Sequence, residues 1–267
     1  MTDGARLYRI VVVPVGPPRQ LGILLQHLGH QKDAFDEAHL WVNTLDPSAI
    51  EECVAQGRSL PWLSLVRSTS AINGGRTLFR FYKDCVRPDA AYLQVSGDVV
   101  WMQEGFVDAM FSARESPGAS GVFMLHANSV NAHQVGGGEA AYSLHKRLQL
   151  AIQAGTTNAW QSCSGIQSLP VGEQMYPSAQ AWLGTDFASF GGVVDPDLAT
   201  AFATTLPTAL GKTNGVLGSA LCAQYCTPPQ RAHLDKTGIL WEYSTIAAAL
   251  TPSSSSSSSL ARGVVTN

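Results

Sequence analysis

One carboxylate stands out in the sequence because it separates two apolar segments. Asp98 follows the β-prone run Tyr92–Val95 and the pair Ser96 and Gly97, and apolar residues resume at Val99. Burying a lone acid between such segments costs free energy unless the carboxylate binds something. At the carboxyl end of a strand in an α/β sheet the usual partner is a ligand. The structural alternative is an Asx turn, in which Asp98 caps its own backbone, and the residues alone leave both open.

A second acid, Asp186, stands between Thr185 and the aromatic residues Phe187 and Phe190. It could cap a helix that begins there, because a carboxylate accepts hydrogen bonds from the free amides of a helix start. It could equally act as a general base held beside a cleft.

A cation follows the first apolar run of the chain. Arg19 comes after a Gly-Pro-Pro turn and just before leucines at helical spacing, so it is expected near a helix start at the carboxyl edge of the sheet. That position suits an anionic ligand. A solvated surface arginine is the alternative.

The composition excludes several classes of protein. The formal net charge is −3 and the hydrophobic fraction is 45%, so a sizeable core is possible but the basic surface of a nucleic-acid binder is missing. No apolar run reaches the ~18 residues of a membrane span. The first residues lack the apolar core of a signal peptide, which leads us to expect a cytoplasmic protein.

The five cysteines are odd in number and scattered, which favours a reducing compartment over a disulfide framework. Cys222 and Cys226 could form half of a zinc site, but no second Cys/His pair lies nearby at ligand spacing. Buried free thiols are the preferred interpretation.

Apolar strands and amphipathic helices alternate through the first hundred residues, which is typical of βαβ units and a mostly parallel sheet. The predicted strands are Tyr8–Val15, Ala38–Asn43, Leu63–Arg67, Tyr92–Val95 and Gly121–Leu125. The predicted helices are Leu21–Leu28, Pro47–Gln56, Arg76–Cys85, Glu104–Arg114, Ala140–Ala154, Pro196–Leu206 and Ile239–Leu250. Loops are expected over His126–His133, Asn158–Pro177 and Gly211–Gly218, and residues 251–267, with their serine run, read as a flexible tail.

In their order along the chain, these segments resemble the nucleotide-sugar glycosyltransferases of the GT-A fold, over about residues 7 to 250. The resemblance extends to a little-characterised group of bacterial and viral GT-A-like proteins. It rests on Val11–Gly16 with Arg19, His39–Thr44, Phe81–Cys85, Tyr92–Trp101, Ala127–Asn131, Trp182–Phe187 and Pro229–Arg231. It implies one α/β domain of the GT-A (Rossmann-like) type over residues 1–250, with a mixed, mostly parallel sheet flanked by helices.

The resemblance also implies an activity. The protein would be a glycosyltransferase, a hexosyl- or pentosyltransferase, that moves a sugar from a nucleotide-diphosphate sugar to a hydroxyl of a glycan or other acceptor, with inversion. Asp186 matches the acid that serves as base in inverting members, and Trp182 would shape the acceptor side unless it is a core residue. The implied donor-binding residues are Pro14, Val15, Gly16, Arg19, Asn43, Thr44, Asp46, Arg76, Ser96, Gly97 and Asp98.

In the GT-A fold the strand corresponding to Tyr92–Val95 ends in an Asp-x-Asp motif whose last acid binds Mn²⁺ or Mg²⁺. Asp98 matches that metal ligand, but Ser96 replaces the first carboxylate. Gln224 stands where similar chains place a metal-binding histidine, and a neutral amide is a poorer ligand. The resemblance therefore implies a weakly held ion, a replacement of the ion by cations such as Arg19 and Arg76, or a loss of catalysis.

Two other functions remain open on the sequence. The changes at Ser96, Gly97 and Gln224 favour a non-catalytic GT-A-like protein that binds or assembles. A nucleotidyltransferase of related topology is disfavoured, because no basic, glycine-rich phosphate loop follows the first strand.

Overall fold

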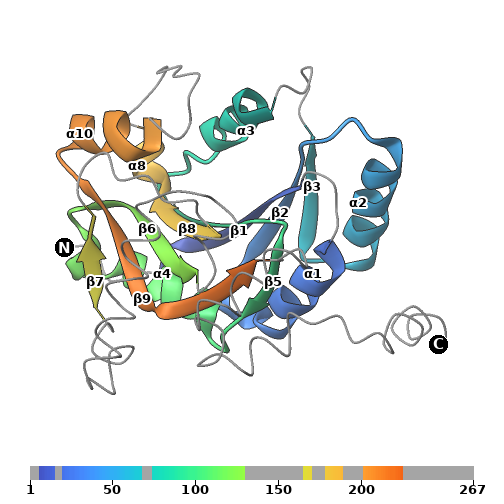
Figure 1. The fold of residues 1–267 in the computed structure, drawn as a ribbon, viewed down its shortest axis with the longest axis horizontal. Helices are drawn as coiled ribbons and strands as arrows, with labels where there is room; N and C mark the ends of the chain where they lie inside the picture. The colour runs from blue at the N-terminus through green and yellow to red at the C-terminus, as the bar shows by residue number, and fades with distance from the viewer. Residues whose placement is uncertain are drawn as a thin grey trace, which may run out of the picture. The chain divides into compact units, whose positions relative to one another are not determined.

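A computed structural model describes residues 6–15, 20–67, 74–129, 165–169, 178–188 and 201–224. All of these residues fall within one compact unit, Met1–Gln224. They form a mixed sheet in the order β3-β2-β1-β4-β8-β6-β9-β5, with β7 paired to β9 (Figure 1). The expected helices at Ala140–Ala154 and Ile239–Leu250, and the expected tail, lie outside the described residues.

The first part of the chain is a set of βαβ units, as the alternating pattern predicts. Its elements are β1 (Tyr8–Val15), α1 (Leu21–His30), η1 (Lys32–Ala34), β2 (Glu37–Val42), α2 (Pro47–Ser59), β3 (Leu63–Arg67), α3 (Gly74–Lys83) and β4 (Ala90–Val95). The neighbours β3, β2, β1 and β4 pair in parallel, so their carboxyl ends meet at one edge of the sheet.

The second part of the chain extends the sheet with antiparallel and parallel pairings. Its elements are β5 (Val99–Met102), α4 (Phe106–Glu115), η2 (Pro117–Ala119), β6 (Val122–Ser129), β7 (Ile166–Ser168), β8 (Ala179–Leu183), α8 (Gly184–Ala188), η3 (Ala201–Thr205), α10 (Leu206–Leu210) and β9 (Thr213–Gln224). Strand β8 runs antiparallel to both β4 and β6, whereas β6 and β9 are parallel.

Three loop predictions are corrected by these bounds. The loop expected from His126 is strand as far as Ser129, because β6 continues between β8 and β9. The loop expected at Gly211–Gly218 is strand from Thr213 onward. Within the segment expected to lack regular structure, Ile166–Ser168 pair with β9 as β7. In each case pairing with a neighbouring strand overrides weak local propensity.

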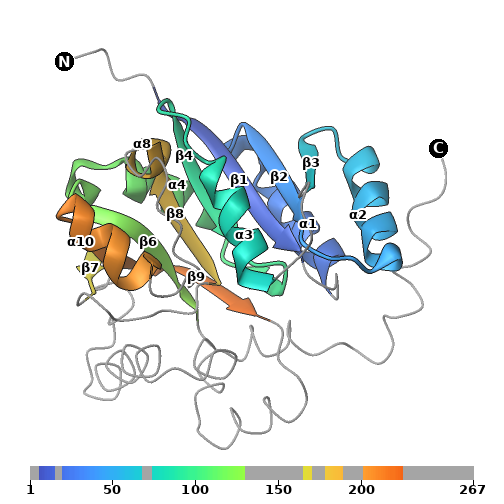
Figure 2. The same ribbon diagram turned by 90° about the horizontal axis from the view of Figure 1, so that it is seen from above.

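The two faces of the sheet are covered differently. Residues of α1, α2 and α4 pack on one face against the aliphatic positions of β1, β2 and β4. The other face carries an aromatic cluster that also takes in residues of α3, α8 and α10. Figure 2 shows α3 lying across β1 and β4 on this face. None of the helices described here is long and apolar enough to cross a bilayer.

Trp182 belongs to this aromatic cluster. Its side chain is fully buried, and its ring stacks on Tyr92 with centroids 5.7 Å apart. The core interpretation is therefore confirmed, and the expectation that Trp182 shapes an acceptor site is wrong. Cys53, Cys85 and Cys222 are buried free thiols, as expected.

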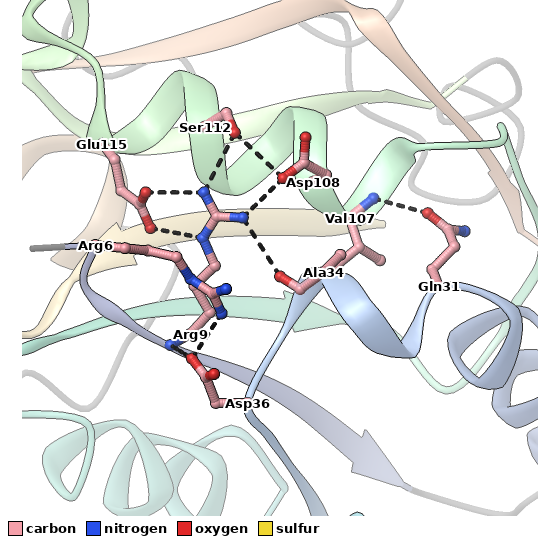
Figure 3. Close-up of polar contacts among 9 residues, drawn as sticks. All are labelled: Arg6, Arg9, Gln31, Ala34, Asp36, Val107, Asp108, Ser112 and Glu115. Atoms are coloured by element: carbon pink, nitrogen blue, oxygen red, sulfur yellow. Dashed lines mark hydrogen bonds and ion pairs between the residues drawn. The ribbon is translucent and has the colours of Figure 1, made fainter.

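The amino edge of the sheet is fastened by a buried cation (Figure 3). The Arg9 guanidinium donates to the carboxylates of Glu115 and Asp108 on α4, at 2.9 and 2.8 Å. The carboxylate of Asp36 accepts from the Arg9 backbone amide at 2.8 Å and from Arg6 at 2.9 Å. Strand β1 is thereby tied to α4 and to the segment that leads into β2.

Candidate active site at the carboxyl edge of the sheet

Asp98 lies in the turn between β4 and β5, and its side chain is exposed. The turn is closed by a hydrogen bond from Val99 N to Ser96 O at 3.0 Å, and Asp98 N approaches Ser96 Oγ at 3.5 Å. Within the described residues the Asp98 carboxylate has no hydrogen bond or ion pair. Among the described residues, the Asx-turn alternative is therefore not formed, and none of their polar groups engages the Asp98 carboxylate.

Neighbouring strands hold this turn in place. Ser96 N donates to Ser178 O at the start of β8, at 2.8 Å. On the other side, Val99 pairs with Gln224 at the end of β9. A Cβ at Gly97 would meet Pro14 O at 3.1 Å, so the end of β1 closely approaches the turn. The structure thus brings Pro14, Ser96, Gly97, Asp98 and Gln224 close together at this edge.

The end of β2 contributes a second group of polar residues at the same edge. Asn43 N donates to Val15 O at 3.0 Å, which extends the ladder between β2 and β1. The Asn43 side-chain oxygen is buried and has no hydrogen-bond partner among the residues that the structure describes. A buried acceptor without a partner costs about 1–3 kcal/mol, and a ligand donor at this edge would relieve that cost.

Thr44 and Asp46 have structural contacts that the cap chemistry of the sequence predicts. Asp46 is the N-cap of α2, and its Oδ1 accepts from Ser48 N at 3.0 Å and from Ser48 Oγ at 2.8 Å. These hydrogen bonds from Ser48 lower the pKa of the Asp46 carboxyl group. Thr44 Oγ1 accepts from Asp46 N at 3.1 Å. The Asp46 carboxylate is therefore engaged in the cap of α2, but the residue is still exposed to solvent.

Three predicted cationic and loop positions are only partly located. Gly16 and Arg19 lie outside the described residues. Arg76 lies in the first turn of α3, whose backbone begins at Gly74, but its side chain is not described. Because α3 leads from β3 to β4, and the two strands point the same way, its first turn lies toward the carboxyl edge.

Asp186 does not belong to this site. It is buried, and its carboxylate pairs with Arg114 of α4 at 2.8 Å and with Lys212 at 2.7 Å. It follows the end of β8, where Leu183 pairs with Ala91 near the start of β4. Asp186 is thus at the amino edge, away from Asp98, and this position and its ion pairs contradict the expectation that it is a general base beside the cleft. Its ion pairs with two cations indicate a structural role.

A row of buried polar side chains that the sequence pattern did not predict lies just before the carboxyl edge. Gln94 of β4 pairs with Gln180 of β8, which pairs with His126 of β6, so the three side chains lie on one face. The preceding row, Tyr92 and Trp182, is aromatic. The signal was present, because each polar residue interrupts an apolar strand at a position where the alternation requires an inward side chain.

His126 is the member of this row with an unsatisfied ring nitrogen. Its side chain is 4% exposed, and its Nδ1 has no hydrogen-bond partner among the described residues. Burial alone lowers the pKa of His126 to about 4, so its imidazole is neutral near pH 7.

The residues around Asp98 supply few ligands for a divalent ion. The described part of the chain contains no group of three or more His, Cys, Asp or Glu side chains that could hold a metal. The available donors are the Asp98 carboxylate, the Ser96 hydroxyl and the Gln224 side chain, which is also held by another contact. Mg²⁺ commonly binds through one or two carboxylates together with substrate phosphates. This donor set fits an ion that arrives with a diphosphate better than an ion bound by protein alone.

Comparison with known proteins shows the fold. No family model and no curated protein matches the chain. Among solved structures, a mannosyltransferase from Pyrobaculum calidifontis, in complex with GDP-Man and Mn²⁺, is 13% identical with a TM-score of 0.52. GalNAc-T7 with UDP, GalNAc and Mn²⁺ is 11% identical with a TM-score of 0.56. This chain has a GT-A-like fold.

The similarity covers most of this chain but only part of these larger proteins. It spans 92% of this chain and 65% of the mannosyltransferase, and 83% of this chain and 44% of GalNAc-T7. A mycobacterial protein of 14% identity matches over 93% of this chain and 76% of its own, with a TM-score of 0.51. In the GT-A-like sheet of this protein, the turn with Asp98 lies at the edge where open α/β sheets bind ligands.

Proposed function

We propose that this protein is a glycosyltransferase that takes its sugar from a nucleotide-diphosphate donor. The observation that carries the proposal is the exposed carboxylate of Asp98, which has no hydrogen bond or ion pair within the described part of the chain, at the carboxyl edge of a GT-A-like sheet. The turn that bears this acid is held by backbone pairing at Ser96 and Val99, and such a fixed position supports the binding of a ligand. Two of the similar structures contain a nucleotide or nucleotide sugar together with Mn²⁺.

In this proposal Asp98 holds a divalent ion, Mn²⁺ or Mg²⁺, that arrives with the donor diphosphate. Ser96 and Gln224 are neutral, so Asp98 supplies the negative charge on the protein side of the ion. The ion, when bound, neutralises the charge that develops on the departing diphosphate. Arg76 in the first turn of α3, and Arg19 after β1, would pair with phosphate oxygens, because a guanidinium matches them in geometry.

The nucleoside would bind along the ends of β1 and β2. Pro14, Val15 and Gly16 would line one side, and Asn43, Thr44 and Asp46 would face the base or ribose. The Asn43 Oδ1, which lacks a partner in the described part of the chain, supports this placement, since it can accept a hydrogen bond from a nucleoside donor. The sugar carbon that leaves the diphosphate oxygen would bond to an acceptor hydroxyl of a glycan or another molecule. With Asp186 at the amino edge, the proposal assigns neither the acceptor base nor the stereochemical outcome.

The direct experiment is a panel of UDP- and GDP-sugars with and without Mn²⁺, followed by calorimetry and by detection of released nucleoside diphosphate. The proposal predicts that at least one donor binds, that Mn²⁺ strengthens binding, and that the product is a diphosphate. Release of a nucleoside monophosphate would indicate a nucleotidyltransferase instead.

A non-catalytic binding protein with this fold is the second candidate. The observation that favours it is the absence, among the described residues, of a carboxylate or histidine cluster that could hold a metal. It predicts that replacing Asp98 with alanine changes neither nucleotide affinity nor any turnover. Metal-dependent donor binding that is lost in the Asp98 variant would rule it out.

A further inference from the structure

Three buried polar side chains form a closed hydrogen-bonded set between α3 and the sheet, which we name the Tyr82 triangle (Tyr82, Gln94 and Gln180). The Tyr82 hydroxyl donates to Gln94 Oε1. Gln180 Nε2 lies 2.8 Å from the same oxygen and 2.9 Å from the Tyr82 hydroxyl oxygen. The three side chains are 2%, 6% and 2% exposed, respectively. The Tyr82 hydroxyl, Gln94 Oε1 and Gln180 Nε2 are therefore mutually hydrogen-bonded.

The surroundings of the triangle are aromatic. The Tyr82 ring packs edge-on against Trp41 and Phe202, with centroids 5.3 and 4.9 Å apart, and stacks on Phe187 at 6.1 Å. Apolar side chains of the same shape would make the protein about as stable as these polar ones do. The reason is that each hydrogen bond formed on folding replaces a hydrogen bond to water, so its net contribution is small. A buried polar set contributes specificity instead, since any arrangement that leaves one member unpaired costs the full desolvation penalty.

The arrangement that the triangle specifies is the register of β8 on β4. Gln94 and Gln180 are register partners, and the next hydrogen bond toward the carboxyl edge is Ser96 N to Ser178 O. A slip of β8 along β4 would separate the two glutamines and also remove Ser178 from Ser96. The bond that fixes the turn before Asp98 therefore depends on the register that the triangle holds.

The same triangle ties the end of α3 to β4 and β8. Tyr82 lies near the end of α3, and Arg76 lies in the first turn of the same helix. A rigid helix held by Tyr82 at one end keeps its first turn at a fixed place over the carboxyl edge.

We infer that Tyr82, Gln94 and Gln180 are positioning residues that hold the Ser96–Val99 turn and the start of α3 in one fixed relation. The consequence for ligand binding rests on the proposed function: Asp98 and the first turn of α3 then face the same diphosphate. The effect on the order of the Ser96–Val99 turn does not depend on the proposed function, and it can be measured without any ligand.

The test compares Tyr82→Phe with Tyr92→Phe. Both remove one hydroxyl from a buried ring on the same face, but the Tyr92 hydroxyl accepts from Arg87 N at the amino edge, at 3.4 Å. Backbone amide exchange of Ser96 and Val99 is measured by mass spectrometry or NMR. Tyr82→Phe is expected to speed exchange at these two amides by about tenfold, whereas Tyr92→Phe leaves it unchanged. Equal exchange in the two variants overturns the inference.

Gln180→Met provides an independent variant if Tyr82→Phe does not fold. It removes the contribution of β8 but leaves the bond between Tyr82 and Gln94. The same faster exchange at Ser96 and Val99 is expected, and wild-type exchange in a folded Gln180→Met protein contradicts the inference.

A second measurement separates this inference from the proposed function. UDP and GDP with Mn²⁺ are titrated into the wild type and both tyrosine variants. Tyr82→Phe is expected to raise the dissociation constant by about tenfold relative to Tyr92→Phe at matched thermal stability. A wild type that binds neither nucleotide would refute the proposed function and leave the exchange result standing. Faster exchange with unchanged affinity would refute the role of the triangle in binding.

Discussion

Asp98 and Asp186 lie at opposite ends of one strand pair. Asp98 follows the carboxyl end of β4, and Asp186 follows the end of β8, where Leu183 is paired with Ala91 near the start of β4. Asp98 is exposed and unpaired within the described residues, whereas Asp186 is buried between two cations. Replacing Asp98 should therefore affect ligand binding, whereas replacing Asp186 should affect stability.

Replacing Asp98 with asparagine should remove ligand binding without loss of stability. Since the carboxylate makes no protein contact in the described part of the chain, the free energy of unfolding should change by less than about 0.5 kcal/mol. The activity with the best donor should fall on the order of a hundredfold. Urea denaturation and calorimetry with Mn²⁺ and the donor nucleotide measure the two effects. Asp33→Asn, another exposed acid, on η1, is the matched control and should behave as wild type.

Replacing Asp186 with asparagine should do the reverse. Loss of the charge leaves Arg114 buried without its counterion, which should cost about 3 kcal/mol of unfolding free energy. Asp89→Asn breaks an exposed, solvent-screened pair with Arg87 and should leave the free energy of unfolding close to the wild-type value. Nucleotide affinity, measured well below the melting temperature, should stay at the wild-type value. An Asp186→Asn protein of normal stability that has lost turnover would restore the catalytic interpretation.

Stability should fall as the pH falls from about 6.5 to about 4, and His126 should account for part of that loss. Its pKa is about 4 in the folded protein and about 6.5 when unfolded. Between these values the unfolded chain binds the extra proton, so acid favours unfolding, by up to about 3 kcal/mol at the lower end. Urea denaturation from pH 4.5 to 7.5 gives the slope. His126→Leu should flatten this slope.

Burial also lowers the pKa of His27, whose Nε2 bonds to Val100 O at 3.2 Å. His27 therefore adds a dependence of the unfolding free energy on pH that has the same sign, and this smaller part should remain in His126→Leu. If His126→Leu showed the full wild-type dependence on pH, the assignment to His126 would be contradicted.

Arg9 should matter for stability alone. Arg9→Met removes the guanidinium that joins β1 to Glu115 and Asp108, so the free energy of unfolding should fall by about 2 kcal/mol. The loss is no larger because the freed carboxylates can regain hydrogen bonds to water. Arg87→Met, at an exposed pair, should cost less than about 0.5 kcal/mol. Thermal and urea denaturation compare the two. Loss of nucleotide affinity in a folded Arg9→Met protein would mean that the two edges of the sheet are coupled.

The early elements could be predicted because local pattern and tertiary environment agree there. The predicted bounds of β1 and β3 are those of the structure, and Asp46 caps α2 as its position before Pro47 suggests. The end of β6 could not be read in the same way. His126 and Asn128 are polar, and their inward orientation depends on neighbours that lie far away along the chain.

The position of Asp98 was predictable because it depends on a single turn after a parallel strand. The position of Asp186 was not, because it depends on the direction of β8. Asp98 follows a strand whose neighbours are parallel, so its edge could be inferred from the order of elements. Asp186 follows a strand that runs the other way, and the sequence carries no sign of that reversal. Its partner Arg114 lies on α4, and such an ion pair between distant segments cannot be read from local spacing.

The network around Arg9 has a consequence for engineering. It fastens β1, α4 and the lead-in to β2 at the rim of the sheet that lies away from Asp98. Loops grafted onto the opposite rim would leave this anchor untouched, so recognition could be redesigned there while the scaffold keeps its cohesion.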